Sequence, residues 1–389
     1  MKILFFDWAS FGDRDIVDTF SILGHTVVLS SLRYTNEQCD DVFVDACCRL
    51  LDQQAIEVVF TSNYYPVVAK ACYRKDVKYA AWVYDSPQLL LYHKSIHYPT
   101  NYVFLFDSVE YDRLSKLGME TVYYMPLAVN TQRLDQMHAD TDQQRYYDCD
   151  IAFVGSLYNE EHKLYDRMLM RMADYDRGYL DAMLQAQRNV YGYYFLEERL
   201  RDSDILQRMS DAMPYDEDLD SFVTKEYIYA NYFMGRKLAE IERTEVLQTL
   251  GPVCKVHAYT EGDVSAMSGV HKMNCVNYYD EMPFAFRYAK INLNISLRTI
   301  QSGIPLRCFD IMGAGGFLLT NYQKDFTPLF EPGVDYVYYD SREDMYHKIA
   351  YYLENEDERI QIARNGHDKV LKYHGYGNRL SKIMKIVMG

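Results

Sequence analysis

The most informative part of the chain is the stretch Arg298-Thr-Ile-Gln-Ser-Gly303-Ile-Pro305-Leu-Arg307-Cys-Phe-Asp310-Ile-Met-Gly313-Ala-Gly315-Gly316-Phe-Leu-Leu-Thr-Asn321. Its apolar end, Phe317–Asn321, predicts a strand, and the alternating residues Ile291–Ser296 predict another strand just before it. Between the two strands Gly303 opens a turn, and Pro305 fits the first position of a helix, where a missing N–H costs nothing. The glycines that follow end this helix and let backbone pass close to backbone. The pattern is therefore strand, glycine turn, short helix and strand.

The helix start in this stretch is suited to an anion, because free N–H groups and the positive end of the helix dipole meet there. Arg298 and Arg307 flank the turn, and Asp310 lies on the same helix. A sugar nucleotide needs this set of groups, since its diphosphate binds cations and amides and its ribose diol binds a carboxylate. We therefore predict that a nucleotide-diphosphate sugar is bound by Arg298, Ser302, Gly303, Ile304, Pro305, Arg307 and Asp310.

Four motifs of the chain resemble GT-B glycosyltransferases. In that family the donor helix carries a Glu, seven further residues and a second Glu; Asp310 matches the second acid, and Ser302 stands at the first. The sequence from Gly303 to Gly316 is similar to that of the CgeB-type, or spore maturation protein-like, branch of the glycosyltransferase family 1/4-like enzymes. The other matches occur in the family's order and are Trp82-Val-Tyr-Asp85-Ser-Pro87, Tyr124-Met-Pro-Leu-Ala-Val-Asn130 and Asp150-Ile-Ala-Phe-Val-Gly155-Ser-Leu-Tyr158.

Strand and helix patterns alternate along the chain, which implies an α/β fold with parallel sheets covered on both faces. With 389 residues the chain favours two domains. We expect two doubly wound, Rossmann-like domains that face each other across a cleft, as the GT-B resemblance implies. The predicted units are an N-terminal acceptor-side domain (1–140), a C-terminal nucleotide-sugar domain (141–374) with a helical insertion at about 160–250, and a helix (375–389) that crosses back to the first domain. The N-terminal strands are expected at Ile3–Trp8, Thr26–Ser31, Val58–Ser62, Tyr79–Tyr84, Tyr102–Phe106 and Thr121–Met125.

Two positions of the N-terminal domain are candidates because ligands bind at the carboxyl ends of parallel strands. Asp85 follows the strand Tyr79–Tyr84 and could bind or deprotonate an acceptor hydroxyl, as a catalytic residue. The alternative is an acid that caps a turn before Ser86 and Pro87. Gly12 lies in the loop that, by the resemblance, adjoins the transferred sugar and the acceptor.

Further candidates follow strands of the C-terminal domain. Gly155 and Ser156 come directly after the predicted strand Asp150–Val154, in a loop that faces the donor phosphates in the resembled fold. His257 and Tyr259 end the strand Val256–Tyr259 and could reach the base or the sugar. A turn glycine and a structural histidine are the alternative interpretations of Gly155 and His257. Arg298 is predicted to be catalytic as well, because developing phosphate charge needs a cation.

Composition narrows the class of protein. The net charge of −15 disfavours nucleic acid and anionic membranes as partners. The eight cysteines form no Cys-x-x-Cys pair, which is typical of reduced thiols in a cytoplasmic protein. No apolar stretch approaches the ~20 residues that cross a bilayer. The ten histidines show no metal spacing and no Asp-x-Asp motif occurs, so we expect neither a metal nor another cofactor.

The predicted activity is metal-independent transfer of a sugar from a nucleotide-diphosphate donor to a protein, glycan or other acceptor hydroxyl. Two alternatives stay open. One is a non-hydrolysing sugar-nucleotide epimerase on the same fold, which would need acids and a histidine in the cleft. The other is a catalytically silent sugar-nucleotide-binding subunit, because Ser302 replaces the first acid of the resembled motif.

Overall fold

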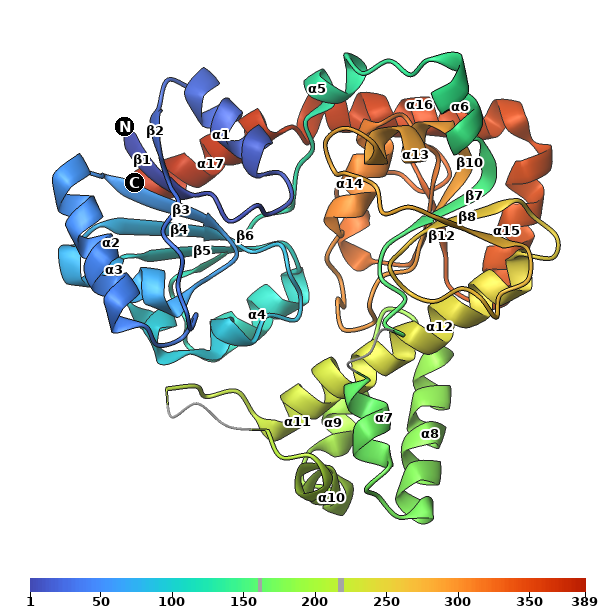
Figure 1. The fold of residues 1–389 in the computed structure, drawn as a ribbon, viewed down its shortest axis with the longest axis horizontal. Coiled ribbons are helices and arrows are strands. Elements are labelled where there is room, and N and C mark those ends of the chain that lie inside the picture. Colours follow the sequence, from blue (N-terminus) through green and yellow to red (C-terminus); the bar gives the residue numbers. More distant parts are fainter. Residues whose placement is uncertain (160–162, 216–219) are drawn as a thin grey trace.

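The computed structural model describes residues 1–159, 163–215 and 220–389 and contains two six-stranded parallel sheets (Figure 1). The first sheet has the order β2-β1-β3-β4-β5-β6, and with its helices it forms the N-terminal lobe. Its strands match the six predicted ones to within two residues at each end. They are β1 (Lys2–Phe6), β2 (Thr26–Ser30), β3 (Val58–Ser62), β4 (Lys78–Trp82), β5 (Asn101–Leu105) and β6 (Val122–Tyr124).

The second sheet has the order β12-β11-β10-β7-β8-β9 and forms the C-terminal lobe. Its strands are β7 (Cys149–Val154), β8 (Val256–Tyr259), β9 (Val270–Met273), β10 (Ala289–Asn294), β11 (Leu318–Asn321) and β12 (Val337–Tyr339). The sequence patterns did not predict β9. This strand lies at the sheet edge with His271 and Lys272 exposed, so it lacks the apolar run of a buried strand.

Helices cover both faces of the N-terminal sheet, as the strand–helix alternation predicts. Helix α1 buries Ile16 and Phe20 against the sheet. Helix α4 begins after Asp107, whose side chain accepts hydrogen bonds from the N–H groups of Val109 and Glu110. The helical segments of this lobe are α1 (Asp13–Ile22), α2 (Asp41–Gln54), α3 (Pro66–Lys75), η1 (Leu89–Tyr92), η2 (Lys94–His97) and α4 (Ser108–Lys116).

The last helix, α17 (Tyr376–Met388), crosses back to the N-terminal lobe and packs against α1 (Figure 1). Lys78 on β4 donates to the carbonyl of Val387 at 2.7 Å. This is the predicted closing helix. The other helical segments that connect or cover the C-terminal sheet are α5 (Thr131–Asp135), α6 (Thr141–Tyr147), α13 (Met282–Tyr288), α14 (Leu306–Gly313), η4 (Lys324–Phe326), α15 (Arg342–Glu354) and α16 (Glu356–Tyr373).

A helical insertion leaves the C-terminal sheet between β7 and β8 and lies below the two lobes in the view of Figure 1. It has an apolar core of its own, around Met168, Leu180 and Met234. Residues 160–162 and 216–219 of the predicted insertion lie outside the described residues. Its segments are α7 (Leu164–Leu169), α8 (Asp174–Arg188), α9 (Leu196–Leu200), α10 (Asp204–Ala212), α11 (Lys225–Ile228), the π-helix η3 (Tyr229–Met234) and α12 (Gly235–Leu250).

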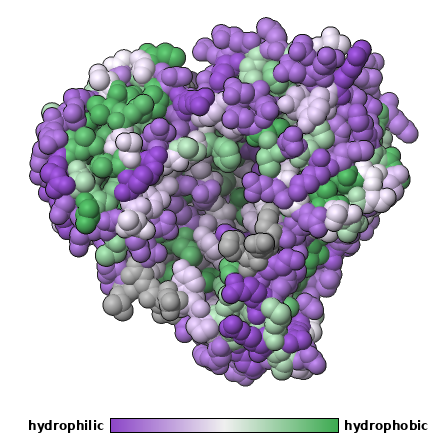
Figure 2. All heavy atoms as spheres, in the orientation of Figure 1, coloured by the Kyte–Doolittle hydropathy of each residue, from purple (hydrophilic) through white to green (hydrophobic). Residues whose placement is uncertain are grey.

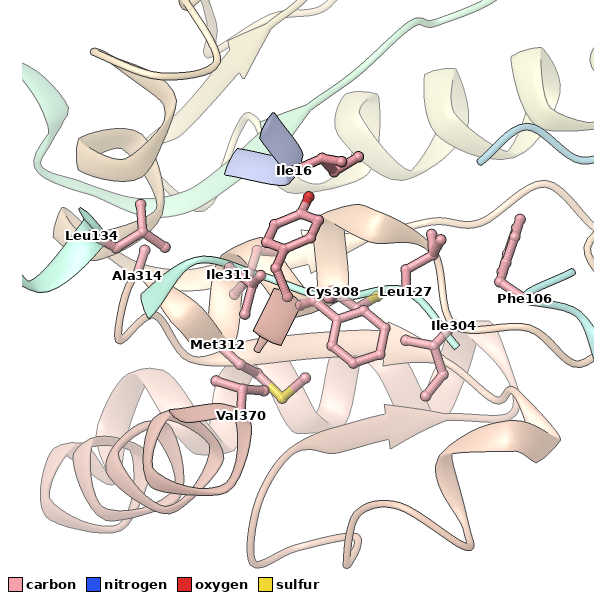
Figure 3. Close-up of a cluster of buried hydrophobic side chains, with 14 of the residues drawn as sticks. Ile16, Phe106, Leu127, Leu134, Ile304, Cys308, Ile311, Met312, Ala314 and Val370 are labelled. Carbon is pink, nitrogen blue, oxygen red and sulfur yellow. The ribbon is translucent and has the colours of Figure 1, made fainter. Parts of the chain in front are cut away.

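Helix α14, which lies within the stretch Arg298–Asn321, is anchored in an apolar core shared by both lobes. Cys308, Ile311 and Met312 gather there with Leu127 and Val370 (Figure 3). Hydrophilic residues cover most of the face seen in Figure 2. The shared core fixes α14 between the lobes, and one face of the helix is left for a ligand.

Candidate functional site

A cavity of about 530 Å³ opens between the two lobes at the carboxyl ends of β7 and β8. The loop after β1 contributes Phe11, and the start of α14 closes the opposite side. This is the edge at which parallel α/β sheets bind ligands. The lining residues are Phe11, Val154, Gly155, Ser156, Tyr259, Thr260, Glu261, Cys275, Val276, Tyr278, Met282, Leu306, Arg307 and Asp310.

Asp310, which was predicted to bind the donor, lies on the wall of this cavity. The residue is 5% exposed, and the hydroxyl of Tyr278 donates to its Oδ1 at 3.1 Å. Burial raises the pKa of Asp310 to about 7. The carboxyl group is thus held in place by one hydroxyl group, and it can accept further hydrogen bonds from the hydroxyl groups of a ligand.

Two arginines meet beneath the turn at Gly155 and Ser156. Arg307 lines the cavity and makes one long hydrogen bond, 3.4 Å, to Asn294. Arg243, from α12, donates to the carbonyl of Ser156 at 2.7 Å. Neither arginine forms an ion pair with a carboxylate in the part of the chain that the structure describes. Burial lowers the pKa of both groups, and the charge of Arg243 lowers the pKa of Arg307 further. Two close cations without a counter-ion form a site that favours an anion.

Sequence reasoning missed Arg243. Helix α12 buries Leu238, Ala239, Val246 and Leu247 on one stripe, and Arg243 falls on the same stripe. A charged residue at a position that helical periodicity assigns to the core was the available signal.

Arg298 was predicted to contact phosphate, but it lies outside the cavity lining. Its guanidinium group donates to Glu242 at 2.6 Å in a buried ion pair and lies 3.5 Å from the ring centre of Tyr191. Glu242 stands on the buried stripe of α12 and therefore needs a cation close by. The geometry assigns Arg298 a structural partner, and its predicted catalytic role has no support from this arrangement.

The turn at Gly303 was predicted to be open to phosphate, and the structure instead places it against the N-terminal lobe. A Cβ atom on Gly303 would lie 2.7 Å from Phe106 and 2.8 Å from the backbone of Asp107. Ser302 is fully buried and donates to Asp107 at 2.7 Å. The turn is therefore a contact between lobes, because only a residue without a side chain fits there.

The start of α14 itself does border the cavity. Pro305 stands one residue before the helix, at the cap, rather than at the predicted first helical position. Ile304 points into the shared core (Figure 3). Leu306 and Arg307, in the first turn, line the cavity. The predicted helix N-terminus is thus close to the ligand site, although the preceding turn is not.

Gly155, Ser156 and Tyr259, which were predicted to bind the donor, all line the cavity. A Cβ atom on Gly155 would approach Arg307 Nη2 to 3.0 Å, and the residue has a φ of +149°. His257 is not among the lining residues. Its ring lies on β8 near His271, and burial lowers its pKa to about 4. This placement corresponds to the structural interpretation of His257.

The N-terminal side of the cleft holds two acids. Asp13, at the start of α1, accepts from Ser62 Oγ and from the N–H of Ser10, both at 2.8 Å, and burial raises its pKa to about 6. Asp85 is exposed and accepts from Asn63 Nδ2 at 2.7 Å. Neither acid is among the residues that line the cavity.

Gly12 contacts the closing helix rather than the cavity. It has a φ of +81°, and a Cβ atom there would collide with the hydroxyl of Tyr376 on α17. Its neighbour Phe11 is the residue of this loop that reaches the cavity. Gly12 thus lets the loop and α17 approach each other.

No group of three His, Cys, Asp or Glu side chains suited to a metal ion occurs in residues 1–159, 163–215 and 220–389. Metal independence stays a prediction. Across the same ranges, no helix combines the length and the apolar character needed to cross a membrane.

Comparisons with known proteins agree with this architecture. The model of a family described as glycosyl transferase-like matches residues 237–385, which include α12, Arg307 and Asp310. No curated protein matched the sequence significantly. The structure resembles the HepE protein of Anabaena in complex with UDP-glucose, at 11% identity and a TM-score of 0.56, over 100% of this chain and 99% of that one.

Two further solved structures are similar over almost their whole lengths. Sucrose-phosphate synthase from Thermosynechococcus elongatus has 9% identity and a TM-score of 0.55, with 100% of this chain and 99% of that chain covered. A glycosyltransferase from Rickettsia africae has 11% identity and a TM-score of 0.53, with 99% and 97% covered. The fold of this chain is therefore GT-B, as predicted.

Proposed function

We propose that this chain is a glycosyltransferase that moves a sugar from a nucleotide-diphosphate donor to an acceptor hydroxyl. The observation that carries the proposal is one cavity lined by an acid, Asp310, and by Arg307, which forms no ion pair with a described residue. A second arginine, Arg243, donates to the carbonyls of Ser156 and Ile295 and lies close enough to Arg307 to add positive charge there. Support comes from the glycosyl transferase-like match and from HepE, whose structure was determined with UDP-glucose. A uridine nucleotide is accordingly the first donor to test.

In this proposal the donor's ribose diol binds Asp310, and the base lies along the apolar wall formed by Tyr259, Val276 and Met282. The diphosphate reaches Gly155 and the two arginines. When the nucleotide diphosphate leaves, negative charge grows on the phosphate oxygens, and Arg307 and Arg243 neutralise it. The first turn of α14 adds the positive end of its dipole. No metal is needed in this scheme, and the metal-free mechanism is part of the proposal.

Asp85 is the proposed base for the acceptor hydroxyl. Its exposed carboxylate is oriented by Asn63, which also accepts from the N–H of Asp85 at 3.1 Å. An oriented but accessible carboxylate can take a proton from an incoming hydroxyl. Both carboxylate oxygens of Asp13 already accept hydrogen bonds from its own lobe, from the N–H of Ser10 and from Ser62 Oγ. Asp13 is therefore assigned a structural role in the loop before α1.

One observation favours a second candidate, a catalytically silent nucleotide-sugar-binding protein. The resembled motif has an acid where Ser302 stands, and Ser302 is sealed between the lobes by Asp107 and Asp325. No acid from that position can therefore act in the cavity. A protein of this kind would bind the donor without turnover.

A donor screen tests both candidates. UDP-, GDP- and ADP-sugars would be titrated by calorimetry and incubated for release of nucleotide diphosphate, with Arg307→Met as the variant. The proposal expects binding of at least one donor and slow hydrolysis that the variant suppresses. Binding without any turnover, also with a panel of acceptors, would favour the silent protein. Epimerised nucleotide sugar, or no binding of any donor, would overturn the proposal.

The finer assignments are proposals too. We assign the chain to the CgeB-type branch on its motifs, and to the cytoplasm on its eight free cysteines. We also keep the domain boundaries at 140 and 374, which fall between β6 and β7 and between α16 and α17.

A further inference from the structure

A second cavity, of about 210 Å³, adjoins the cavity of about 530 Å³ that we propose binds the donor (the donor cavity). It shares Ser156 with the donor cavity, and most of its wall comes from α7, η3 and the start of α12. A ligand that extends beyond the diphosphate would meet this space. Its volume is below the ~300–1,000 Å³ of pockets for whole drug-sized ligands. It therefore suits a single ring.

Tyr165 lies on α7, is 3% exposed and lines the cavity. Its Oη is buried and makes no hydrogen bond to any described residue. A buried hydroxyl group without a partner is unfavourable unless a ligand or water satisfies it.

The remaining wall combines aromatic rings with fixed charged groups. Tyr232 and Phe233 of η3 present rings, and Lys237 Nζ lies 2.9 Å from both Asp166 and Glu240. The two oriented carboxylates can accept hydrogen bonds from the hydroxyl groups of a ligand, and the ammonium group can donate to those hydroxyl groups. Rings together with paired donors and acceptors match a sugar, which has apolar C–H faces and hydroxyl edges.

The backbone around this cavity is unusual in two places. Tyr232 and Phe233 belong to a π-helix, a form that recurs at functional sites. Tyr158, also on the wall, has a φ of +57°, which is strained for a residue with a side chain. Both departures shape the same wall.

One wall residue of this cavity contacts the segment that carries the proposed base. The hydroxyl of Tyr232 donates to the carbonyl of Pro87 at 3.1 Å, two residues after Asp85. Burial raises the pKa of Tyr232, and the charge of Asp85 raises it further, so Asp85 lies within electrostatic reach of this wall.

We propose that this cavity binds a monosaccharide ring of the acceptor, so that the acceptor of this enzyme is a glycan or glycoside. The inference rests on the proposed glycosyl transfer and specifies its acceptor class. Tyr165 and the Asp166–Lys237–Glu240 group bind the ring's hydroxyl groups, and Tyr232 packs against its face.

The experiment is ligand-observed saturation-transfer NMR with methyl glycosides of glucose, galactose, mannose and N-acetylglucosamine, on wild-type protein saturated with UDP. The variants are Tyr165→Phe, which removes only the unpaired hydroxyl, and Tyr232→Ala. Tyr193→Phe is the matched control, because Tyr193 is an exposed tyrosine of the same insertion. UDP affinity is measured for every variant by calorimetry.

The expected result is a glycoside signal that persists with UDP bound, falls about fivefold in Tyr165→Phe and Tyr232→Ala, and is unchanged in Tyr193→Phe. UDP affinity stays at the wild-type value in all three variants. The absence of a signal from all four methyl glycosides with the wild-type protein would overturn the inference. So would displacement of the glycoside by UDP-glucose but not by UDP, since the cavity would then hold the donor's sugar. Failure of UDP to bind at all would count against the proposed function. The glycoside signals of the wild type and the variants would still show whether the second cavity binds a sugar ring.

Discussion

Tyr278 holds Asp310 on the wall of the donor cavity through a hydrogen bond of 3.1 Å from its hydroxyl to Oδ1. The two residues come from different segments, the loop before α13 and the helix α14. Burial keeps much of the acid protonated near neutral pH, with a pKa of about 7. A ribose diol that donates to this carboxyl group would favour its ionised form.

The first prediction concerns the loss of this acid. Asp310→Ala should weaken UDP-glucose binding by about 10- to 100-fold, because a charge-assisted hydrogen bond contributes roughly 1.5–3 kcal/mol. Calorimetry on the folded variant measures the effect. Asp357→Ala, at an acid in the first turn of α16, is the control and should bind normally. Equal affinity of Asp310→Ala and wild type would remove Asp310 from the ribose.

The second prediction is a pH dependence. The pKa of Asp310 rises from 3.8 to about 7 on folding, so the folded state binds the proton more tightly. Its contribution to the free energy of unfolding is therefore complete below pH 3.8 and is lost as the pH rises through 7. UDP-glucose binding should release a proton near pH 6–7, measured by calorimetry in buffers of different ionisation enthalpy. Asp310→Asn should abolish this release, and a release that survives in Asp310→Asn must come from another group.

The third prediction separates the arginines. Arg307→Met should lower kcat for donor hydrolysis or transfer by about 10-fold or more, with a smaller loss of donor affinity, because the charge acts mainly in the transition state. Thermal stability should not fall, since Arg307 has no carboxylate partner among the described residues. Steady-state kinetics and a melting curve check both statements. Wild-type kinetics in Arg307→Met would show that this cation does not contact the diphosphate.

Arg298→Met should behave in the opposite way. It leaves Glu242 buried without its cation, and breaking a buried ion pair from one side costs about 3–5 kcal/mol. Denaturant unfolding should therefore show a large loss of stability. The double variant Arg298→Met with Glu242→Gln should recover part of it. A stable Arg298→Met with impaired turnover would restore the catalytic interpretation of Arg298.

The fourth prediction concerns Asp85. If it is the acceptor base, Asp85→Asn should reduce transfer by about 10²-fold or more. UDP-glucose affinity should be intact, because Asp85 lies outside the donor cavity. Asn can replace Asp as a turn acceptor, so near-normal transfer in this variant would leave Asp85 with a structural role only. A weaker acceptor affinity with a modest change in rate would make it an acceptor-binding residue.

The fifth prediction tests the contact between the lobes. Gly303→Ala places a methyl group 2.7 Å from Phe106 and 2.8 Å from Asp107, so stability should fall by about 1–3 kcal/mol. Gly178→Ala is the matched control, because no atom lies within 4 Å of its new Cβ atom. It should be neutral or stabilising, since alanine favours the helix α8. Equal melting temperatures for Gly303→Ala and wild type would show that the lobes separate freely at this turn.

Local pattern determined most of the fold. The bounds of β3 and β8 match their predictions because each strand is a short apolar run that is buried on both faces. The edge strand β9 escaped prediction because two exposed residues, His271 and Lys272, interrupt its pattern. Both outcomes have the same cause, since hydrophobic pattern reports burial and an edge strand is only partly buried.

The candidate site could be predicted in part. Motif spacing and the GT-B resemblance put Asp310, Arg307 and Gly155 in one predicted site, and all three line the same cavity, at the carboxyl edge of a parallel sheet. The partners of the arginines could not be predicted from the chain. Glu242 pairs with Arg298, which is 56 residues away, and Arg243 lies close enough to Arg307 to lower its pKa. Spacing along one segment fixes where a side chain starts, but its partner is fixed by which distant segment packs against it.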